Sequence, residues 1–298
     1  MAVTASMIKE LRERSGAGMS DCKNALIDAN GDMEEAAKLL RERGIAKAVK
    51  KEGRIAAEGL IGTYNQDGVG VLVELNCESD FVSRGEKFHE ILDNIVALVA
   101  KYNPADMDAL NALTLENGTT VADYISEMRG IIGEKIAIRR FVRFESAGMI
   151  QVYVHGEGRL GAMINIDRAL ESEEDLALAY GVAQQLAAYE APYLSPADVP
   201  AEALEEEKNV LRAQILAEGK PEAIAEKMLI GRINKYYEEN CLLKQIYVKG
   251  DGKTSVEKAI GKKFTVTAMA CYEVGKGIEK KKNDLANEVQ EQIEKMKK

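Results

Sequence analysis

The sequence predicts an α+β fold in which antiparallel sheets pack against helices. Two observations carry this prediction. Apolar residues recur at helical spacing in the first 45 residues and again beyond residue 200. Two segments of alternating apolar residues start about 90 residues apart, and each is interrupted by a glycine-containing turn. The shared plan of these two segments indicates a duplicated core of sheet plus helix.

The N-terminal region is predicted to be a compact three-helix module. Residues from about Thr4 to Gly44 contain three short amphipathic segments, separated by Gly16-Ala17-Gly18 and by Asn30-Gly31. An alanine-rich linker with a solvated basic face is expected to follow, carrying Lys47, Lys50, Lys51 and Arg54. We therefore assign residues 1–54 to the module and its linker.

The first half of the core, residues 55–146, is predicted to begin with a β-hairpin. The segment from Gly59 to Asn76 turns at Gln66-Asp67-Gly68. Its second strand alternates apolar residues with Gly70, Leu72, Glu74 and Asn76, the pattern of a strand with one buried face. A helix follows, and the Ser-x-x-Glu spacing of Ser83 and Glu86 predicts a capping box that starts it at Ser83. Its apolar face is expected to contain Phe88, Ile91, Leu92, Ile95 and Val99.

A helix and a strand are predicted to complete this half. The helix covers about Val121 to Ile132, and the strand covers Lys135 to Glu145.

The second half, residues 147–277, is predicted to repeat the plan. A hairpin from Ile150 to Asp167 turns at Gly156-Glu157-Gly158, and a helix starts near Ser172. Two long helical patterns at about 200–240, broken at Gly219-Lys220-Pro221, predict a projecting helical hairpin resembling a coiled coil.

Four further elements are predicted toward the C-terminus. They are a strand at Gln245 to Val248, a helix at Thr254 to Ile260 capped by Thr254 and Glu257, a strand at Phe264 to Tyr272, and an amphipathic helix at 278–298.

Composition narrows the class of protein. The chain has 298 residues, 46% of them hydrophobic, a formal net charge of -9 and a pI of about 5.1. This charge opposes a broad electrostatic contact with nucleic acid and favours a protein partner. Four single cysteines without a C-x-x-C pair suit reduced thiols, and no signal peptide or spanning apolar run is evident. We expect a cytoplasmic protein without membrane contact.

Several patterns imitate chemical sites. Residues 156–161 satisfy G-x-G-x-x-G, which leaves a dinucleotide-dependent enzyme as an alternative. That motif needs a helix at its third glycine, but the alternating pattern of a strand continues past Gly161. Gly252-Lys253-Thr254 resembles the end of a phosphate-binding loop, but Tyr247 stands where its first glycine belongs. His89 and His155 have no metal-ligand spacing around them. We expect no enzyme activity, no cofactor and no metal.

The segment ELNCESDFVSR, residues 74–84, carries an acid beside an aromatic ring where the predicted strand meets the predicted helix. Two interpretations remain open from the spacing. Phe81 packs under the first helical turn as a hydrophobic staple, or it is presented to another protein.

This segment resembles a signature of the bacterial elongation factor Ts family. A second segment, LRERSGAGMSDCKNAL at residues 11–26, resembles the other signature of that family. The family usually has threonine where this chain has Ser15 and Ser79, and both departures keep the hydroxyl group. The resemblance extends over nearly the whole chain, although only these two segments are specific.

The resemblance implies a guanine nucleotide exchange factor for elongation factor Tu, with a ubiquitin-associated fold in the N-terminal module. It implies that Asp80, Phe81, Val82 and Ser83 insert into the nucleotide domain of Tu and disturb its magnesium and phosphate region. By the same resemblance, Arg12, Met19 and Lys23 contact that domain elsewhere, and His155 contacts Tu through the second hairpin. A ubiquitin-like adaptor acting through residues 4–44 is a further alternative, but it leaves the duplicated core without a role.

Overall fold

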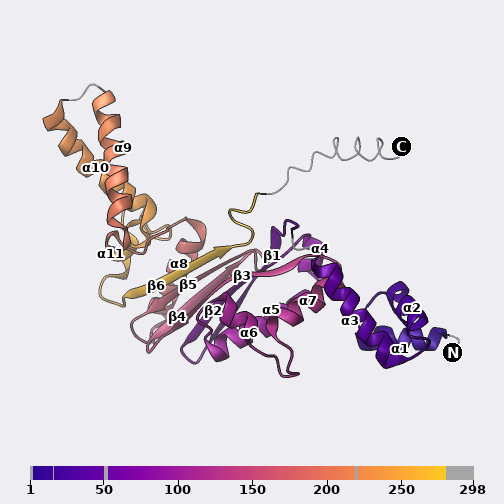
Figure 1. The fold of residues 1–298 in the computed structure, drawn as a ribbon. Coiled ribbons are helices and arrows are strands. Elements are labelled where there is room, and N and C mark those ends of the chain that lie inside the picture. The colour runs from indigo at the N-terminus through magenta and orange to yellow at the C-terminus, as the bar shows by residue number, and fades with distance from the viewer. Residues whose placement is uncertain (1–2, 16, 50–52, 219–220, 280–298) are drawn as a thin grey trace.

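The computed structural model describes residues 3–15, 17–49, 53–218 and 221–279 (Figure 1). At its N-terminus lie α1 (Ala5–Ser15), α2 (Met19–Asp28) and α3 (Met33–Val49). They enclose a small core made by Leu11, Cys22, Ala25, Leu26, Ala29 and Ala36. The three-helix module is confirmed, and its ubiquitin-associated character stays a prediction.

The linker prediction is wrong in part, because α3 continues to Val49. Alanine and lysine are good helix formers, so the alanine-rich stretch extends the helix. Gly16 of the N-terminal signature, together with Lys50 and Lys51, lies outside the described residues.

The first half contains an antiparallel sheet of β1 (Glu58–Gln66), β2 (Val69–Cys77) and β3 (Ile136–Glu145), in the order β1-β2-β3. The predicted hairpin and third strand are confirmed. The hairpin turns at Asp67 and Gly68, whose φ angles of 52° and 73° are both positive, as a two-residue type I′ turn requires.

The helices of this half are α4 (Asp80–Ser83), α5 (Glu86–Tyr102), α6 (Met107–Ala112) and α7 (Val121–Ile132). The apolar face predicted for α5 is buried on the sheet. The capping box at Ser83 is wrong: Ser83 is the last residue of the separate turn α4, and Gly85 precedes α5 without a side-chain cap.

The second half repeats the topology with β4 (Met149–His155), β5 (Leu160–Ile166) and β6 (Val266–Glu273), in the order β4-β5-β6. The helix α8 (Glu173–Ala188) covers this sheet, and the Ser172 side chain caps it. In both halves a hairpin is followed by helices and then by a third strand, which pairs with the second strand of the hairpin. This common order agrees with duplication, while the exact domain boundaries stay predictions.

The predicted helical hairpin is present as α9 (Ala201–Ala217) and α10 (Glu222–Asn240), which follow a short 3-10 turn (Pro196–Asp198). It projects from the sheets at the end of the molecule opposite to α1 and α2 (Figure 1). Its own small core comprises Ile215, Ala225, Leu229 and Ile233.

The strand predicted at 245–248 is wrong. A 3-10 turn (Leu242–Lys244) and an isolated bridge between Ile246 and Ser255 occupy this region, because the chain pairs there at one position only. The following helix is α11 (Val256–Ile260), and Ser255 rather than Thr254 caps it. Nearly all of the predicted C-terminal helix, from residue 280 onward, lies outside the described residues.

The two sheets pack against each other, so the prediction of one buried face for β2 is wrong. Ile61 and Leu72 of the first sheet contact Ile150 and Met163 of the second. A Cβ atom on Gly70 would lie 2.6 Å from the Ile150 side chain, so the absence of a side chain there permits this close approach. Within the described residues, no helix is both long enough and apolar enough to cross a membrane.

Candidate functional site

The one-turn helix α4 presents the acid and the aromatic ring that the sequence singled out. Ser79 precedes it in extended conformation (φ -125°, ψ 155°), and the Ser79 hydroxyl accepts a hydrogen bond from the Val82 N–H over 3.5 Å. At the other end, the Ser83 hydroxyl donates to the Asp80 carbonyl oxygen over 3.0 Å. Asp80 lies in the first turn, where a negative charge interacts favourably with free backbone N–H groups.

The four residues of α4 point in different directions. The Phe81 side chain is 85% exposed, so the hydrophobic-staple interpretation is wrong. Val82 packs against the core of the first half, and Ser83 is buried. The Asp80 carboxylate forms an ion pair with Arg84, with 3.2 Å between Oδ2 and Nη2. The apolar ring is therefore held outside the protein by a turn whose opposite side is anchored.

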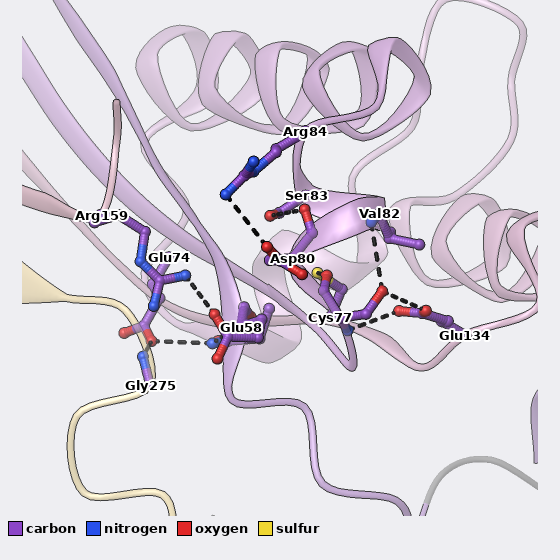
Figure 2. A network of polar contacts seen from close by, with 12 residues as sticks. Glu58, Glu74, Cys77, Asp80, Val82, Ser83, Arg84, Glu134, Arg159 and Gly275 are labelled. Carbon is purple, nitrogen blue, oxygen red and sulfur yellow. Dashed lines mark hydrogen bonds and ion pairs between the residues drawn. The ribbon is translucent and has the colours of Figure 1, made fainter. Parts of the chain in front are cut away.

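The loop between α7 and β3 supports the N-terminus of α4 (Figure 2). The Ser79 N–H donates to Glu134 Oε2 over 3.0 Å, and the Ser79 hydroxyl donates to Glu134 Oε1 over 2.6 Å. In return, the Lys135 N–H donates to Glu78 Oε1 over 2.6 Å.

Sequence reasoning missed this support. Ser79 followed by Asp80 is a local signal for a helix start, and it would have identified the cap. Nothing local identifies Glu134, because 55 residues separate it from Ser79.

The turn of the second hairpin lies next to α4. One groove is lined by Asp80, Ser83, Arg84 and His89 from the α4 and α5 region and by Gly156, Glu157 and Arg159 from the hairpin turn, together with Glu58 and Leu60. Arg159 Nη1 donates to Glu58 Oε2 over 2.6 Å, and the Ile61 N–H donates to the Gly158 carbonyl oxygen over 2.7 Å. These contacts attach the turn to β1.

His155, at the end of β4, is exposed beside this turn. The Tyr153 hydroxyl lies 2.9 Å from His155 Nδ1, and the Tyr153 ring packs edge-on against Tyr180 with 5.6 Å between centroids. Tyr153 therefore limits the orientations open to the imidazole.

The N-terminal candidates are also accessible. Arg12 on α1, together with Met19 and Lys23 on α2, is exposed, and Met19 is 48% exposed. Ile27 is 50% exposed and follows Met19 and Lys23 at intervals of four, so the three lie on one helix face. Ile27 was not predicted from the sequence, although its spacing of four residues from Lys23 indicates the same helix face.

The patterns that imitate chemical sites are turns in the structure. Gly156 to Gly158 connect two antiparallel strands and Gly161 lies inside β5, which contradicts the dinucleotide alternative. Asp251 Oδ1 accepts hydrogen bonds from the N–H groups of Lys253 and Thr254, which forms a turn rather than a phosphate loop. Across the described ranges, no three His, Cys, Asp or Glu side chains are grouped so that they could hold a metal ion.

The fold and this site define an α+β protein with two three-stranded antiparallel sheets that presents an aromatic side chain on a short helical turn. A family model described as elongation factor TS matches residues 78–276. The elongation factor Ts of Clostridium perfringens (strain 13 / Type A) is 45% identical over 297 residues, which cover 96% of this chain and 98% of that protein. The elongation factor Ts of Symbiobacterium thermophilum is 43% identical, with 97% of this chain and 98% of that protein covered.

The chain therefore belongs to the elongation factor Ts family, as its two signature segments predicted. The family places it among the nucleotide exchange factors of translation elongation.

Proposed function

We propose that this protein promotes release of GDP from elongation factor Tu by inserting Asp80 and Phe81 into the nucleotide domain of Tu. The observation that carries the proposal is the 85% exposure of Phe81 on a turn whose Val82 packs against the core and whose Ser83 is buried. A large apolar ring exposed in this way is ready to be buried against a partner.

The proposed target is the magnesium and phosphate region of Tu. Magnesium requires near-ideal octahedral geometry, so small displacements of the loops that carry its ligands weaken its binding. Since the ion bridges the phosphate oxygens, its loss weakens the bound nucleotide. The Phe81 ring supplies the apolar insertion and Asp80 the polar contact beside it. Val82 completes the insertion by its burial on the core of the first half, and Ser83 by closing the turn from inside.

Burial of a single aromatic ring contributes roughly 1.5 to 3 kcal/mol, which corresponds to about a ten- to hundredfold effect. The rest of the acceleration of GDP release comes from coupling between the binding of the factor and the binding of the nucleotide. If the factor binds nucleotide-free Tu more tightly than GDP-bound Tu, it lowers the affinity of Tu for GDP by the same ratio. The incoming nucleotide in turn lowers the affinity of Tu for the factor. Exchange then proceeds without consumption of any reactant.

Further contacts would orient the factor on Tu. Arg12, Met19 and Lys23 form an accessible surface on the N-terminal module, and His155 lies at the turn beside the groove that α4 borders. A partner bound over this groove would meet α4 and the second hairpin together. We expect this function in the cytoplasm, with Tu rather than a nucleic acid or a membrane as the partner.

The test is the release of fluorescently labelled GDP from Tu. Phe81→Ala should reduce the rate about ten- to hundredfold with unchanged thermal unfolding, because an exposed ring contributes little to stability. Tyr102→Ala, which removes another exposed aromatic side chain on α5, is the matched control and should leave the rate unchanged. Release by Phe81→Ala at the wild-type rate would refute the proposed role of this ring.

A further inference from the structure

The orientation of α4 has to come from outside the helix. A single turn of four residues is far below the length at which a helix is stable alone in water. Its inner side is held by Val82 and Ser83, which lie in the second half of the turn. The N-terminus carries Asp80 and Phe81, so the direction in which it points determines where both side chains lie.

Glu134 holds the residue at which α4 begins. Its two carboxylate oxygens accept the N–H and the O–H of Ser79, the residue that starts α4 (Figure 2). Hydrogen bonds to an ionised carboxylate are stronger than neutral ones, and two on one residue also fix its orientation. The Ser79 hydroxyl has one proton, and because that proton points to Glu134, its lone pairs are left to accept from Val82.

The position of Glu134 is itself well determined. Gly133, with φ 85°, ends α7 in a left-handed conformation and turns the chain toward β3. Arg129 Nε of α7 donates to the Ile136 carbonyl oxygen of β3 over 2.6 Å, which closes the loop around Glu134. The bond from the Lys135 N–H to Glu78 connects the same two loops a second time.

We propose that Glu134 is a positioning residue for nucleotide exchange: through Ser79 it fixes the direction of α4 and thereby the place of the Phe81 ring in the partner. This inference rests on the proposed function, because it assigns Glu134 a role in the exchange step that Phe81 carries out. Glu134 acts on the ring through its two hydrogen bonds to Ser79.

The experiment measures GDP release from Tu at saturating factor and the factor concentration for half-maximal release, using the full chain. Glu134→Ala should lower the maximal rate about tenfold, with a smaller effect on the half-maximal concentration, because the other contact surfaces are intact. Ser79→Ala removes the hydroxyl from the other side of the contact and should lower the rate in the same direction. Glu116→Ala, at an exposed carboxylate in a different loop of this half, is the matched control.

The decisive measurement combines Glu134→Ala with Phe81→Ala. If Glu134 acts by placing the ring, its loss should have little further effect once the ring is absent. An equal loss in both backgrounds would mean a general structural role and would overturn the inference, as would a wild-type rate for Glu134→Ala. If Phe81→Ala alone leaves the rate unchanged, the proposed function fails and this inference falls with it, so the two failures are distinguishable.

If Glu134→Ala does not fold, Glu134→Gln, which keeps the size of the side chain but removes its charge, takes its place in the comparison with Phe81→Ala. Loss of rate by Glu134→Gln in the wild-type background but not in the Phe81→Ala background supports the inference, and the absence of that difference overturns it.

Discussion

Glu74 and Arg140 form an ion pair between a buried carboxylate and a partly exposed guanidinium, with 2.6 Å between Oε2 and Nε. Arg139 Nη1 donates to the other oxygen over 3.0 Å, and the Gly275 N–H donates to that same oxygen over 2.8 Å. Gly275 follows β6, so this carboxylate joins the first sheet to the end of the second (Figure 2). Arg140 also stacks over the Tyr272 ring, 4.2 Å from its centroid.

Replacement of Glu74 by glutamine should destabilise the fold by about 2 to 4 kcal/mol. The neutral side chain leaves two arginines without their counter-charge. Its amide N–H groups would also face the N–H groups that bond the carboxylate in the wild type. Urea unfolding measures the change. Glu145→Gln, at an exposed carboxylate paired with Arg143, is the matched control and should cost less than about 1 kcal/mol. Equal effects of the two variants would contradict a special contribution of the buried Glu74 carboxylate to stability.

The same carboxylate should make stability depend on pH. Burial raises the pKa of Glu74, but hydrogen bonds from Gly275, Arg139 and Arg140 outweigh it, so the pKa lies below its ordinary value of 4.5. A lowered folded-state pKa gives stability that is complete above the unfolded value and is lost as pH falls through the folded one. The stability difference between wild type and Glu74→Gln should therefore be constant above about pH 5.5 and shrink below about pH 4.5. A constant difference down to pH 3 would contradict this.

Glu74 also shows what the sequence could not reveal about the fold. The hairpins, the helix faces and the helical hairpin depend on local periodicity and turn residues, and these predictions were confirmed. In β2, however, Glu74 and Leu72 occupy the face predicted to be exposed, and both are buried because the second sheet covers that face. A β-bulge next to Glu74 breaks the pairing register, so the consecutive residues Arg139 and Arg140 both reach one carboxylate.

The candidate site, like the fold, could be predicted from the sequence only in part. The position of Asp80 and Phe81 after a strand could be read from the sequence, but the exposure of Phe81 could not, since a staple and a presented ring have the same spacing. Glu86 suggested that Ser83 caps the helix after it, whereas α5 has no side-chain cap. The capping serine is Ser79, at the start of α4, and its hydroxyl donates to Glu134 in a distant loop. Contacts between residues far apart in the chain leave no periodic signal in one sequence.

Three of the four cysteines, Cys77, Cys241 and Cys271, should be unreactive in the native protein. Burial, reinforced by the carboxylates of Glu134 and Glu58, raises the pKa of the Cys77 thiol to about 12. Burial likewise raises the pKa of Cys241 and of Cys271 to about 11. Since the thiolate is the reactive form, iodoacetamide at pH 8 should modify these three residues far more slowly than an ordinary thiol. Mass spectrometry follows the modification, and urea-unfolded protein is the control. Rapid native labelling of Cys77 would contradict the prediction.

Gly130 should not tolerate alanine, although it lies inside a helix. Helix propensity alone predicts that Gly→Ala stabilises by up to about 1 kcal/mol. A Cβ atom on Gly130 of α7, however, would lie 2.8 Å from the Cα atom of Gly44 on α3, and backbone cannot rotate away. We expect Gly130→Ala to destabilise by about 1 to 3 kcal/mol in urea unfolding and to displace α3 from α7.

Two matched variants distinguish the effect of the close contact between α3 and α7 from the effect of helix propensity. A Cβ atom on Gly44 would meet Gly130 Cα at 3.8 Å, an ordinary contact, and one on Gly231 of α10 would meet nothing within 4 Å. Both Gly44→Ala and Gly231→Ala should therefore keep or raise the stability of the protein. Because α3 carries the module with Arg12, Met19 and Lys23, Gly130→Ala should also raise the factor concentration needed for half-maximal GDP release, whereas Gly44→Ala should not. Identical behaviour of Gly130→Ala and Gly44→Ala would show that the two helices do not depend on this close approach.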